Sequence, residues 1–182
     1  SSRKSYREGI RMSRITVNIP IGINGDFEVK KVTTDIVVGK NEPLAEYTIL
    51  YKNGVEIMQD TTSEYKEHTP LWENAKGDVL IGGLGLGLVH QALLDNPEVT
   101  SVTIVEKYQE VVDLVWDHCP KDNTFTLITD DFETWEPSQR YDVCWIDTWL
   151  FPEDYETYNT AMILKYSQYC DWVGYWESIP LD

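Results

Sequence analysis

Four glycines within six residues, followed at a fixed distance by an acidic side chain, form the strongest chemical signal in the sequence. The glycines lie in residues 82–87, directly after an apolar run, and Glu106 ends a second apolar run 23 residues after Gly83. Glycine lacks a Cβ and tolerates positive φ, so it suits a sharp turn at which a ligand approaches the backbone. An acidic side chain at this spacing accepts hydrogen bonds from ribose hydroxyls. The pattern predicts a nucleoside site; the alternative is a tight turn that only packs a helix against a sheet.

Three more carboxylates follow predicted strands and belong to the same candidate site. Asp130 and Asp131 come after a third apolar run, and Asp147 comes after a fourth. Ligands bind at the carboxyl ends of parallel strands, so these side chains should meet Glu106 and the glycine turn. The turn contains no Lys or Arg and does not match a P-loop. Such carboxylates suit a neutral sugar and a cationic group, such as the sulfonium of S-adenosylmethionine, better than a diphosphate.

The elements that would position these side chains alternate between strands and helices from Lys76 onward. Apolar runs predict strands at 79–82, 101–105, 124–128, 141–146 and 172–176. Helical periodicity predicts helices at 84–94, 108–116 and 154–169, the last with Ala161, Ile163 and Leu164 facing inward. This alternation predicts an α/β fold with a Rossmann-like, mostly parallel sheet and helices on both faces.

The residues before Lys76 predict a small antiparallel β module ahead of that sheet. Strands are expected at 15–19, 27–32, 34–38, 46–51 and 55–58, with turn chemistry at 21–25. Asn53-Gly54 supplies two positive-φ positions and predicts a hairpin. The expected organisation is a disordered basic tail (1–13), the β module (14–61), a connector with one short helix stopped by Pro70 (62–75) and the Rossmann-like domain (76–182).

The composition of the chain limits the classes of molecule that it can bind. The net charge is −16 although the first 14 residues are basic, and so acidic a surface repels phosphate backbones and argues against nucleic acid. No apolar run has the length of a membrane span, which predicts no membrane partner. Three widely spaced cysteines predict reduced thiols and a cytoplasmic protein. Self-association into a homo-oligomer stays open.

Other polar and aromatic residues have ordinary structural interpretations. His68, His90 and His118 have no Cys or acidic partner at ligand spacing, so we expect surface or packing histidines and no metal site. Glu64 and Glu67 could contact a cationic acceptor, but a solvated face is the favoured interpretation. Three aromatic residues near the end of the fourth parallel strand could cap an adenine or an acceptor, or could pack in the core: Trp145, Trp149 and Tyr155.

Several segments occur in an order that resembles a known family. They are Val-Leu-Ile-Gly-Gly at 79–83, Val-Thr-Ile-Val-Glu at 102–106, Asp130 with Phe132, and Tyr-Asp-Val-Cys-Trp-Ile-Asp at 141–147, preceded by Asn53-Gly54-Val55, Glu64-Tyr65 and Thr69-Pro70-Leu71. Residues 79–149 resemble the core of class I S-adenosylmethionine-dependent methyltransferases. Within that superfamily, residues 44–150 are most similar to the spermidine synthase (polyamine aminopropyltransferase) branch.

The resemblance implies S-adenosylmethionine, or its decarboxylated form, as the cofactor. The glycine loop, with Gly83, Gly85 and Gly87, would hold the methionine part. By the same resemblance Glu106 would bind the ribose, Asp130 would bind the adenine amino group with Asp131 beside it, and Asp147 would border the reacting centre as the catalytic residue. The implied partner is a small-molecule acceptor, with cationic acceptors included.

The chain departs from the aminopropyltransferase pattern at two acidic positions. The Asp of the family's glycine loop is Gly85 here, and the second Asp after the fourth strand, which assists amine deprotonation in the family, is Leu150. The connector is also about four residues shorter. These departures argue against spermidine synthesis, and we expect the loop amides at a helix N-terminus to receive the carboxylate of ordinary S-adenosylmethionine.

Three functions remain in competition. The leading one is an S-adenosylmethionine-dependent transferase that methylates a small molecule, with Asp147 orienting or deprotonating the acceptor. The second is a spermidine synthase-like aminopropyltransferase with an altered acceptor site. The third is a nucleoside-binding or interaction domain that retains the fold without catalysis.

Overall fold

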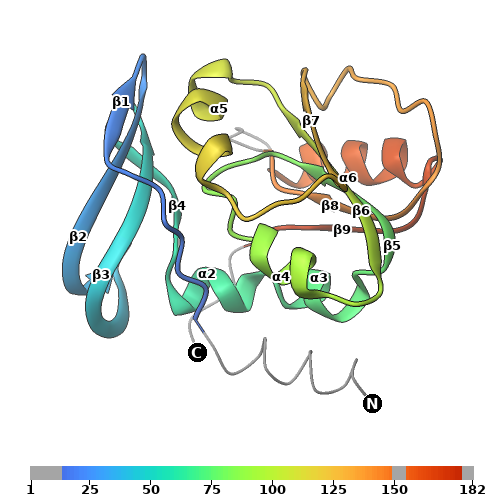
Figure 1. The fold of residues 1–182 in the computed structure, drawn as a ribbon. Helices are drawn as coiled ribbons and strands as arrows, with labels where there is room; N and C mark the ends of the chain where they lie inside the picture. The colour runs from blue at the N-terminus through green and yellow to red at the C-terminus, as the bar shows by residue number, and fades with distance from the viewer. Residues whose placement is uncertain (1–13, 149–154, 178–182) are drawn as a thin grey trace.

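The computed structural model describes residues 14–148 and 155–177, which form two sheets (Figure 1). One sheet is antiparallel, in the order β1-β2-β3-β4, and the other is parallel, in the order β7-β6-β5-β8-β9. The prediction of a β module ahead of a Rossmann-like sheet is therefore confirmed. The predicted basic tail, Trp149, Leu150 and the start of the last predicted helix lie outside the described residues.

The parallel sheet has the strand that precedes the glycine loop at its centre. Its strands are β5 (Gly77–Gly82), β6 (Val99–Glu106), β7 (Phe125–Thr129), β8 (Tyr141–Ile146) and β9 (Cys170–Tyr175). Leu80 of β5 lies opposite Thr103 of β6 and Cys144 of β8, and both pairings are parallel. All four neighbouring pairs run parallel, so the carboxyl ends of the five strands meet at one edge.

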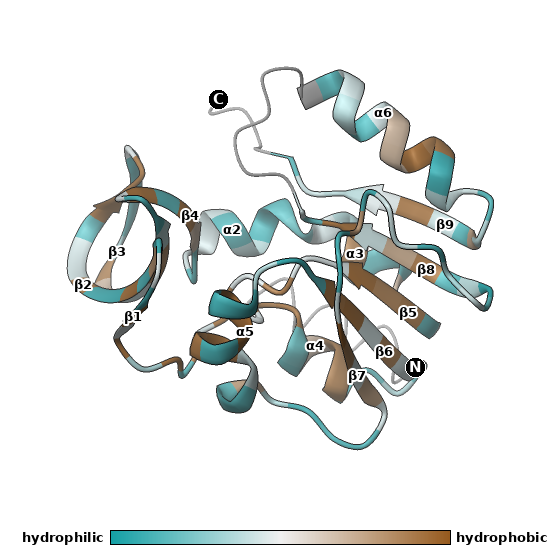
Figure 2. Ribbon diagram, turned by 90° about the horizontal axis from the view of Figure 1, so that it is seen from above, coloured by the Kyte–Doolittle hydropathy of each residue, from teal (hydrophilic) through white to brown (hydrophobic). Residues whose placement is uncertain are grey.

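Helices cover both faces of this sheet, and its strands are rich in hydrophobic residues (Figure 2). The helices are α4 (His90–Asp95), α5 (Gln109–Val115) and α6 (Tyr155–Tyr166), with a short 3-10 turn, η1 (Trp116–His118), after α5. Val79 and Ile81 pack in the core that contains α4 and α5, whereas Leu80 packs in the core that contains α6. Alternate side chains of a strand point to opposite faces, so β5 contributes to both cores.

The inward face of α6 differs from the prediction. Met162 and Tyr166 are buried, whereas Ala161 is exposed and the Leu164 side chain is 66% exposed. The Tyr166 ring stacks on Phe132 with a centroid distance of 4.0 Å, and its hydroxyl donates to the Phe132 carbonyl at 2.6 Å. This contact fixes the rotation of the helix, and the predicted set of inward residues was wrong for Ala161 and Leu164.

The helix predicted at 84–94 begins only at His90. Residues 83–89 form a loop in which Gly83, Gly85 and Gly87 have φ of 96°, 53° and 67°. A right-handed helix needs φ near −60°, so these three residues cannot belong to one. The helix N-terminus therefore does not follow the first glycine turn directly.

The antiparallel module is a four-stranded sheet in which each strand is joined to the next by a hairpin turn. Its strands are β1 (Gly22–Asn24), β2 (Phe27–Val37), β3 (Lys40–Lys52) and β4 (Val55–Gln59). The predicted strands 27–32 and 34–38 form one continuous strand, and β1 occupies the segment expected to be a turn. The hairpin at Asn53-Gly54 is confirmed, since both residues have positive φ between antiparallel β3 and β4.

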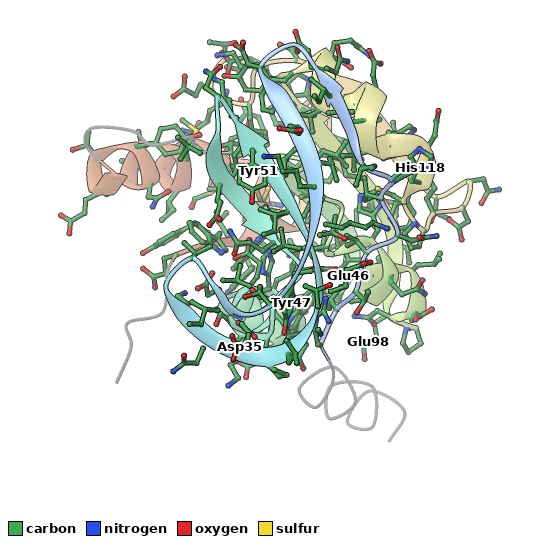
Figure 3. The ribbon with its side chains drawn as sticks, turned by 90° about the vertical axis from the view of Figure 1, so that its left-hand side faces the viewer. Asp35, Glu46, Tyr47, Tyr51, Glu98 and His118 are labelled. Atoms are coloured by element: carbon green, nitrogen blue, oxygen red, sulfur yellow. The ribbon has the colours of Figure 1, made fainter. Side chains whose placement is uncertain are left out.

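Residues 15–19 do not form the predicted strand. The Asp60 carboxylate holds this segment by accepting the Val17 N–H and an Arg14 N–H, both at 3.1 Å. The Arg14 guanidinium also lies 4.2 Å from the centre of the Tyr47 ring. Figure 3 shows this side of the module, with Tyr47 of β3 labelled. The segment is thus fixed by side chains and not by a strand ladder.

The connector contains two helices, α2 (Thr62–Glu67) and α3 (Thr69–Asn74). Pro70 lies in the first turn of α3, where its missing N–H costs no hydrogen bond, so it starts a helix and does not stop one. The Thr61 hydroxyl accepts the Glu64 N–H and caps α2. No helix of the described residues is long and apolar enough to cross a membrane.

Candidate active site

A cavity of about 530 Å³ lies at the carboxyl edge of the parallel sheet, where the antiparallel module covers it. Gly83, Gly85, Glu106, Asp131 and Asp147 line this cavity together with Phe27, Leu50 and Met58 of the module. Five of the seven predicted site residues are therefore brought together. Gly87 and Asp130 are not part of the lining.

Glycine is required at these positions of the loop because neighbouring atoms lie too close to the backbone to leave space for a Cβ. A Cβ on Gly83 would lie 2.1 Å from the Asp147 carbonyl oxygen, and the Gly83 φ of 96° is unfavourable for other residues. A Cβ on Gly85 would lie 2.6 Å from the Met58 sulfur, and one on Gly87 would lie 2.4 Å from the Cys119 sulfur. Gly83 thus lets the ends of β5 and β8 meet, while Gly87 serves packing outside the cavity.

The Glu106 carboxylate ties the glycine loop to the turn after β6. Its Oε1 accepts the Leu84 N–H and its Oε2 accepts the Tyr108 N–H, both at 2.9 Å. Burial raises the pKa of Glu106, and the hydrogen bonds from the Tyr108 and Leu84 amides oppose that rise. A carboxylate has about four lone-pair sites. Backbone N–H groups already use some of these sites on Glu106, so only the remaining ones can accept hydrogen bonds from ribose hydroxyls.

The backbone amides of the glycine loop were expected to be free to bind a carboxylate, but three of them already donate hydrogen bonds within the chain. The Leu84 N–H donates to Glu106, and the Leu86 N–H donates to the Met58 sulfur at 3.2 Å. The Gly83 N–H donates to the Val105 carbonyl at 2.8 Å. Because the helix also begins later than predicted, the argument for carboxylate binding at a helix N-terminus is wrong.

Asp130 and Asp131 separate at the end of β7. Asp131 lines the cavity, and its Oδ2 lies 3.6 Å from the Lys107 ammonium. Asp130 is exposed, and its Oδ1 accepts the Asp131 N–H at 2.7 Å. Asp131 is therefore better placed than Asp130 to face a bound base.

One part of the cavity, called here its acidic end, is lined by buried acidic residues that the sequence interpretation placed on a solvated face. Glu64 is 3% exposed and Glu67 is 5% exposed, and both line the cavity near Asp147. The Trp176 indole N–H lies 3.1 Å from Glu64 Oε2 and 2.9 Å from Glu67 Oε2. Burial, a hydrogen bond to Glu67 and the charges of Asp147 and Glu67 raise the pKa of Glu64 well above its ordinary value.

His68 is the functional residue that the sequence interpretation missed. Its Nδ1 lies 2.7 Å from the Glu64 carbonyl oxygen, which can only accept, so Nδ1 carries a hydrogen. Its Nε2 lies 3.5 Å from Asp147 Oδ2 and, among the described residues, makes no hydrogen bond. The spacing of Glu64, Glu67 and His68 at i, i+3 and i+4 was a usable signal, since such residues share a helix face.

The remaining candidates serve packing. His90 lies against Trp116 and Phe125, and burial lowers its pKa to about 4. Trp145 is buried, stacks parallel to Trp172 and does not line the cavity, so the core alternative holds for it. Trp149 and the Tyr155 side chain lie outside the described residues. Within 14–148 and 155–177, no group of His, Cys, Asp and Glu side chains is arranged to hold a metal ion.

Solved structures share this architecture. Spermidine synthase from Thermotoga maritima aligns with 85% of the chain and 53% of its own length, with 15% identity and a TM-score of 0.51. A probable spermidine synthase from Corynebacterium glutamicum aligns with 75% of the chain, with 15% identity and a TM-score of 0.44. A DhpI–SAH complex aligns with 56% of the chain and 49% of its own length, with 18% identity and a TM-score of 0.44.

The chain spans about half the length of these solved structures. No protein-family model matches the chain, and no curated protein matches it in sequence. The strand order and the Thermotoga alignment show that the parallel part has the class I S-adenosylmethionine-dependent methyltransferase-like fold, with the β module included in the likeness.

Proposed function

We propose that the chain is an S-adenosylmethionine-dependent transferase that methylates a small amine acceptor held beside Asp147. The observation that carries the proposal is the cavity itself. Its lining contains the glycine loop and Glu106 together with Asp147 and the buried acidic residues near it. A two-substrate transfer needs such a shared space, because it proceeds by aligning acceptor and donor.

The residues present fit the cofactor. A volume of about 530 Å³ lies within the range of small-molecule sites. Glu106 would hold the ribose, Asp131 would face the adenine, and Gly83 would allow the methionine part to approach the backbone. When bound, S-adenosylmethionine supplies a methyl group on a sulfonium, which is a good leaving group.

The charge of the cavity supports a cationic acceptor. Among the described residues of its lining, seven are Asp or Glu and two are Lys. An amine enters such a site as an ammonium ion and must lose a proton before its nitrogen can attack. Asp147 is the group placed to orient the amine and take that proton, and the His68 imidazole lies beside it.

Aminopropyl transfer is the second candidate. The alignment with the Thermotoga spermidine synthase extends over 85% of the chain, β module included. The excess of carboxylates over Lys residues in the cavity also suits decarboxylated S-adenosylmethionine, which lacks the carboxylate of the ordinary cofactor. Against it, Gly85 stands where the family has Asp, and Met58 fills the space beside Gly85.

Product analysis separates the candidates. The wild-type chain and Asp147→Asn are incubated with a panel of primary amines and either S-adenosylmethionine or its decarboxylated form. We expect S-adenosylhomocysteine from the first cofactor, with a rate about 100-fold lower in Asp147→Asn, as for loss of a general base. Methylthioadenosine formed only from the decarboxylated cofactor would establish aminopropyl transfer instead. If neither cofactor gives a product, the remaining candidate is a nucleoside-binding or interaction domain without catalysis.

A further inference from the structure

Lys40 enters the acidic end of the cavity from the antiparallel module. It follows the turn between β2 and β3, and its ammonium lies 2.7 Å from Glu67 Oε1. The Lys40 side chain is 20% exposed and that of Glu67 is 3% exposed, so water screens this ion pair only weakly. An ammonium of the protein itself thus occupies a carboxylate of the proposed acceptor site.

Both carboxylate oxygens of Glu67 already have partners. Its Oε1 accepts from Lys40, its Oε2 accepts the Trp176 indole N–H, and it also takes a hydrogen bond from the Glu64 carboxyl. Burial, that hydrogen bond and the neighbouring carboxylates raise the pKa of Glu64 well above its ordinary value. Glu64 therefore favours its protonated form, and the Glu67 charge is balanced by Lys40.

Asp147 differs from both glutamates. Its side chain is 16% exposed and faces the buried His68 Nε2, which lacks a hydrogen-bond partner among the described residues. The His68 Nδ1 donates to the Glu64 carbonyl, so Nε2 is the ring nitrogen that faces Asp147. Asp147 itself lines the cavity, and no described Lys or Arg side chain lies within ion-pair distance of its carboxylate.

We propose that Lys40 is a tethered ammonium group that occupies Glu67, leaves Asp147 to bind the ammonium of the ligand, and so restricts the acceptor end to ligands with one positive charge. The inference rests on the proposed acceptor site and names its substrate class: monoamines, with diamines excluded. A second ammonium on the ligand would compete with Lys40 for Glu67. Lys40 is then a specificity-determining residue that needs no contact with the reacting nitrogen.

Calorimetric titration with butylamine and 1,4-diaminobutane tests this proposal on the wild-type chain, Lys40→Met and the matched control Lys40→Arg. We expect the wild type and Lys40→Arg to bind butylamine at least about tenfold more tightly than 1,4-diaminobutane, because the second ammonium of the diamine meets Lys40. In Lys40→Met, diaminobutane should bind about tenfold more tightly than in the wild type, because its second ammonium gains a buried carboxylate. Butylamine affinity should change by less than about threefold.

A second variant keeps the test decisive if Lys40→Met does not fold. Glu67→Gln leaves the Lys40 charge uncompensated, so butylamine should bind about tenfold more weakly than in the wild type. The proposal is overturned if the wild type binds diaminobutane as tightly as butylamine, if Lys40→Met leaves diamine affinity unchanged, or if none of the proteins binds either amine. Parallel titrations with S-adenosylmethionine separate the two proposals: amine selectivity without cofactor binding would count against the transferase and not against Lys40.

Discussion

His68 Nε2 and Asp147 Oδ2 lie 3.5 Å apart, and the two residues come from the connector and from the end of β8. The imidazole is buried between Trp72 and Trp145, with ring centroids 5.7 Å and 5.6 Å away. Its Nδ1 is held by the Glu64 carbonyl, so the ring cannot turn without losing that bond. The ring is therefore held with its Nε2 directed at the Asp147 carboxylate.

Replacing His68 by Phe should slow transfer without weakening cofactor binding. Phe retains an aromatic ring between Trp72 and Trp145 but removes both nitrogens. We expect kcat to fall about 10- to 100-fold, at the lower end of general acid–base effects, with unchanged S-adenosylmethionine affinity. If His68 acts through Asp147, the double variant with Asp147→Asn should be no slower than Asp147→Asn alone. Additive losses in the two single variants would show that His68 acts independently.

The buried Glu64 predicts a pH dependence of stability. Its pKa lies well above the ordinary 4.5 in the folded chain, so its contribution to stability is complete below pH 4.5 and is lost as pH rises through the folded pKa. Glu64→Gln, which mimics the protonated form, should flatten this decline by at most about 1.4 kcal/mol per pH unit. Urea unfolding at several pH values measures it, with the exposed Glu46→Gln as control. Equal slopes in wild type and Glu64→Gln would contradict the assignment.

Gly85 and Met58 should be coupled in stability. Gly85→Ala places a Cβ 2.6 Å from the Met58 Cε and requires φ of 53°, so we expect a loss of about 2 kcal/mol or more. Met58→Ala removes the steric part, and the double variant should therefore lose less than the sum of the single variants. Urea unfolding of the three variants measures this coupling. Strict additivity would show that the loop does not pack against Met58. The same contact means that Gly85→Asp, the natural test of cofactor choice, also needs Met58→Ala.

The two aspartates at the end of β7 should differ in their effect on cofactor binding. Asp131 lines the cavity and Asp130 does not. Asp131→Ala should weaken S-adenosylmethionine binding about tenfold, whereas Asp130→Ala should change it by less than about threefold. Equilibrium dialysis with labelled cofactor measures both. The reverse order would favour the role that family resemblance gives to Asp130.

The centre of the parallel sheet could be predicted from sequence because β5 and β8 are largely buried and appear as apolar runs. The run ending at Ile146 matches β8 (Tyr141–Ile146) at both ends. The helix prediction was wrong in the glycine loop because Leu84, Leu86 and Leu88 are buried there, as the apolar residues of a helix would be. Local pattern does not reveal that intervening glycines have positive φ.

The acidic end of the cavity could not be predicted because its partners are distant in sequence. Glu67 is held by Lys40 and Trp176, and its burial follows from that tertiary contact. A carboxylate in a polar connector is ordinarily solvated, and only the packing of the module against the sheet removes it from water. The same packing creates the cavity.

Calorimetric titration of the wild-type chain and Glu106→Ala tests most directly whether the glycine loop and Glu106 form an S-adenosylmethionine site. We predict saturable binding of one cofactor per chain by the wild type. Glu106→Ala, shown to be folded by circular dichroism, should bind about 10- to 150-fold more weakly, the equivalent of about 1.5–3 kcal/mol for hydrogen bonds to a charged group. No saturable binding by the wild type, or equal affinity in a folded Glu106→Ala, would contradict the account.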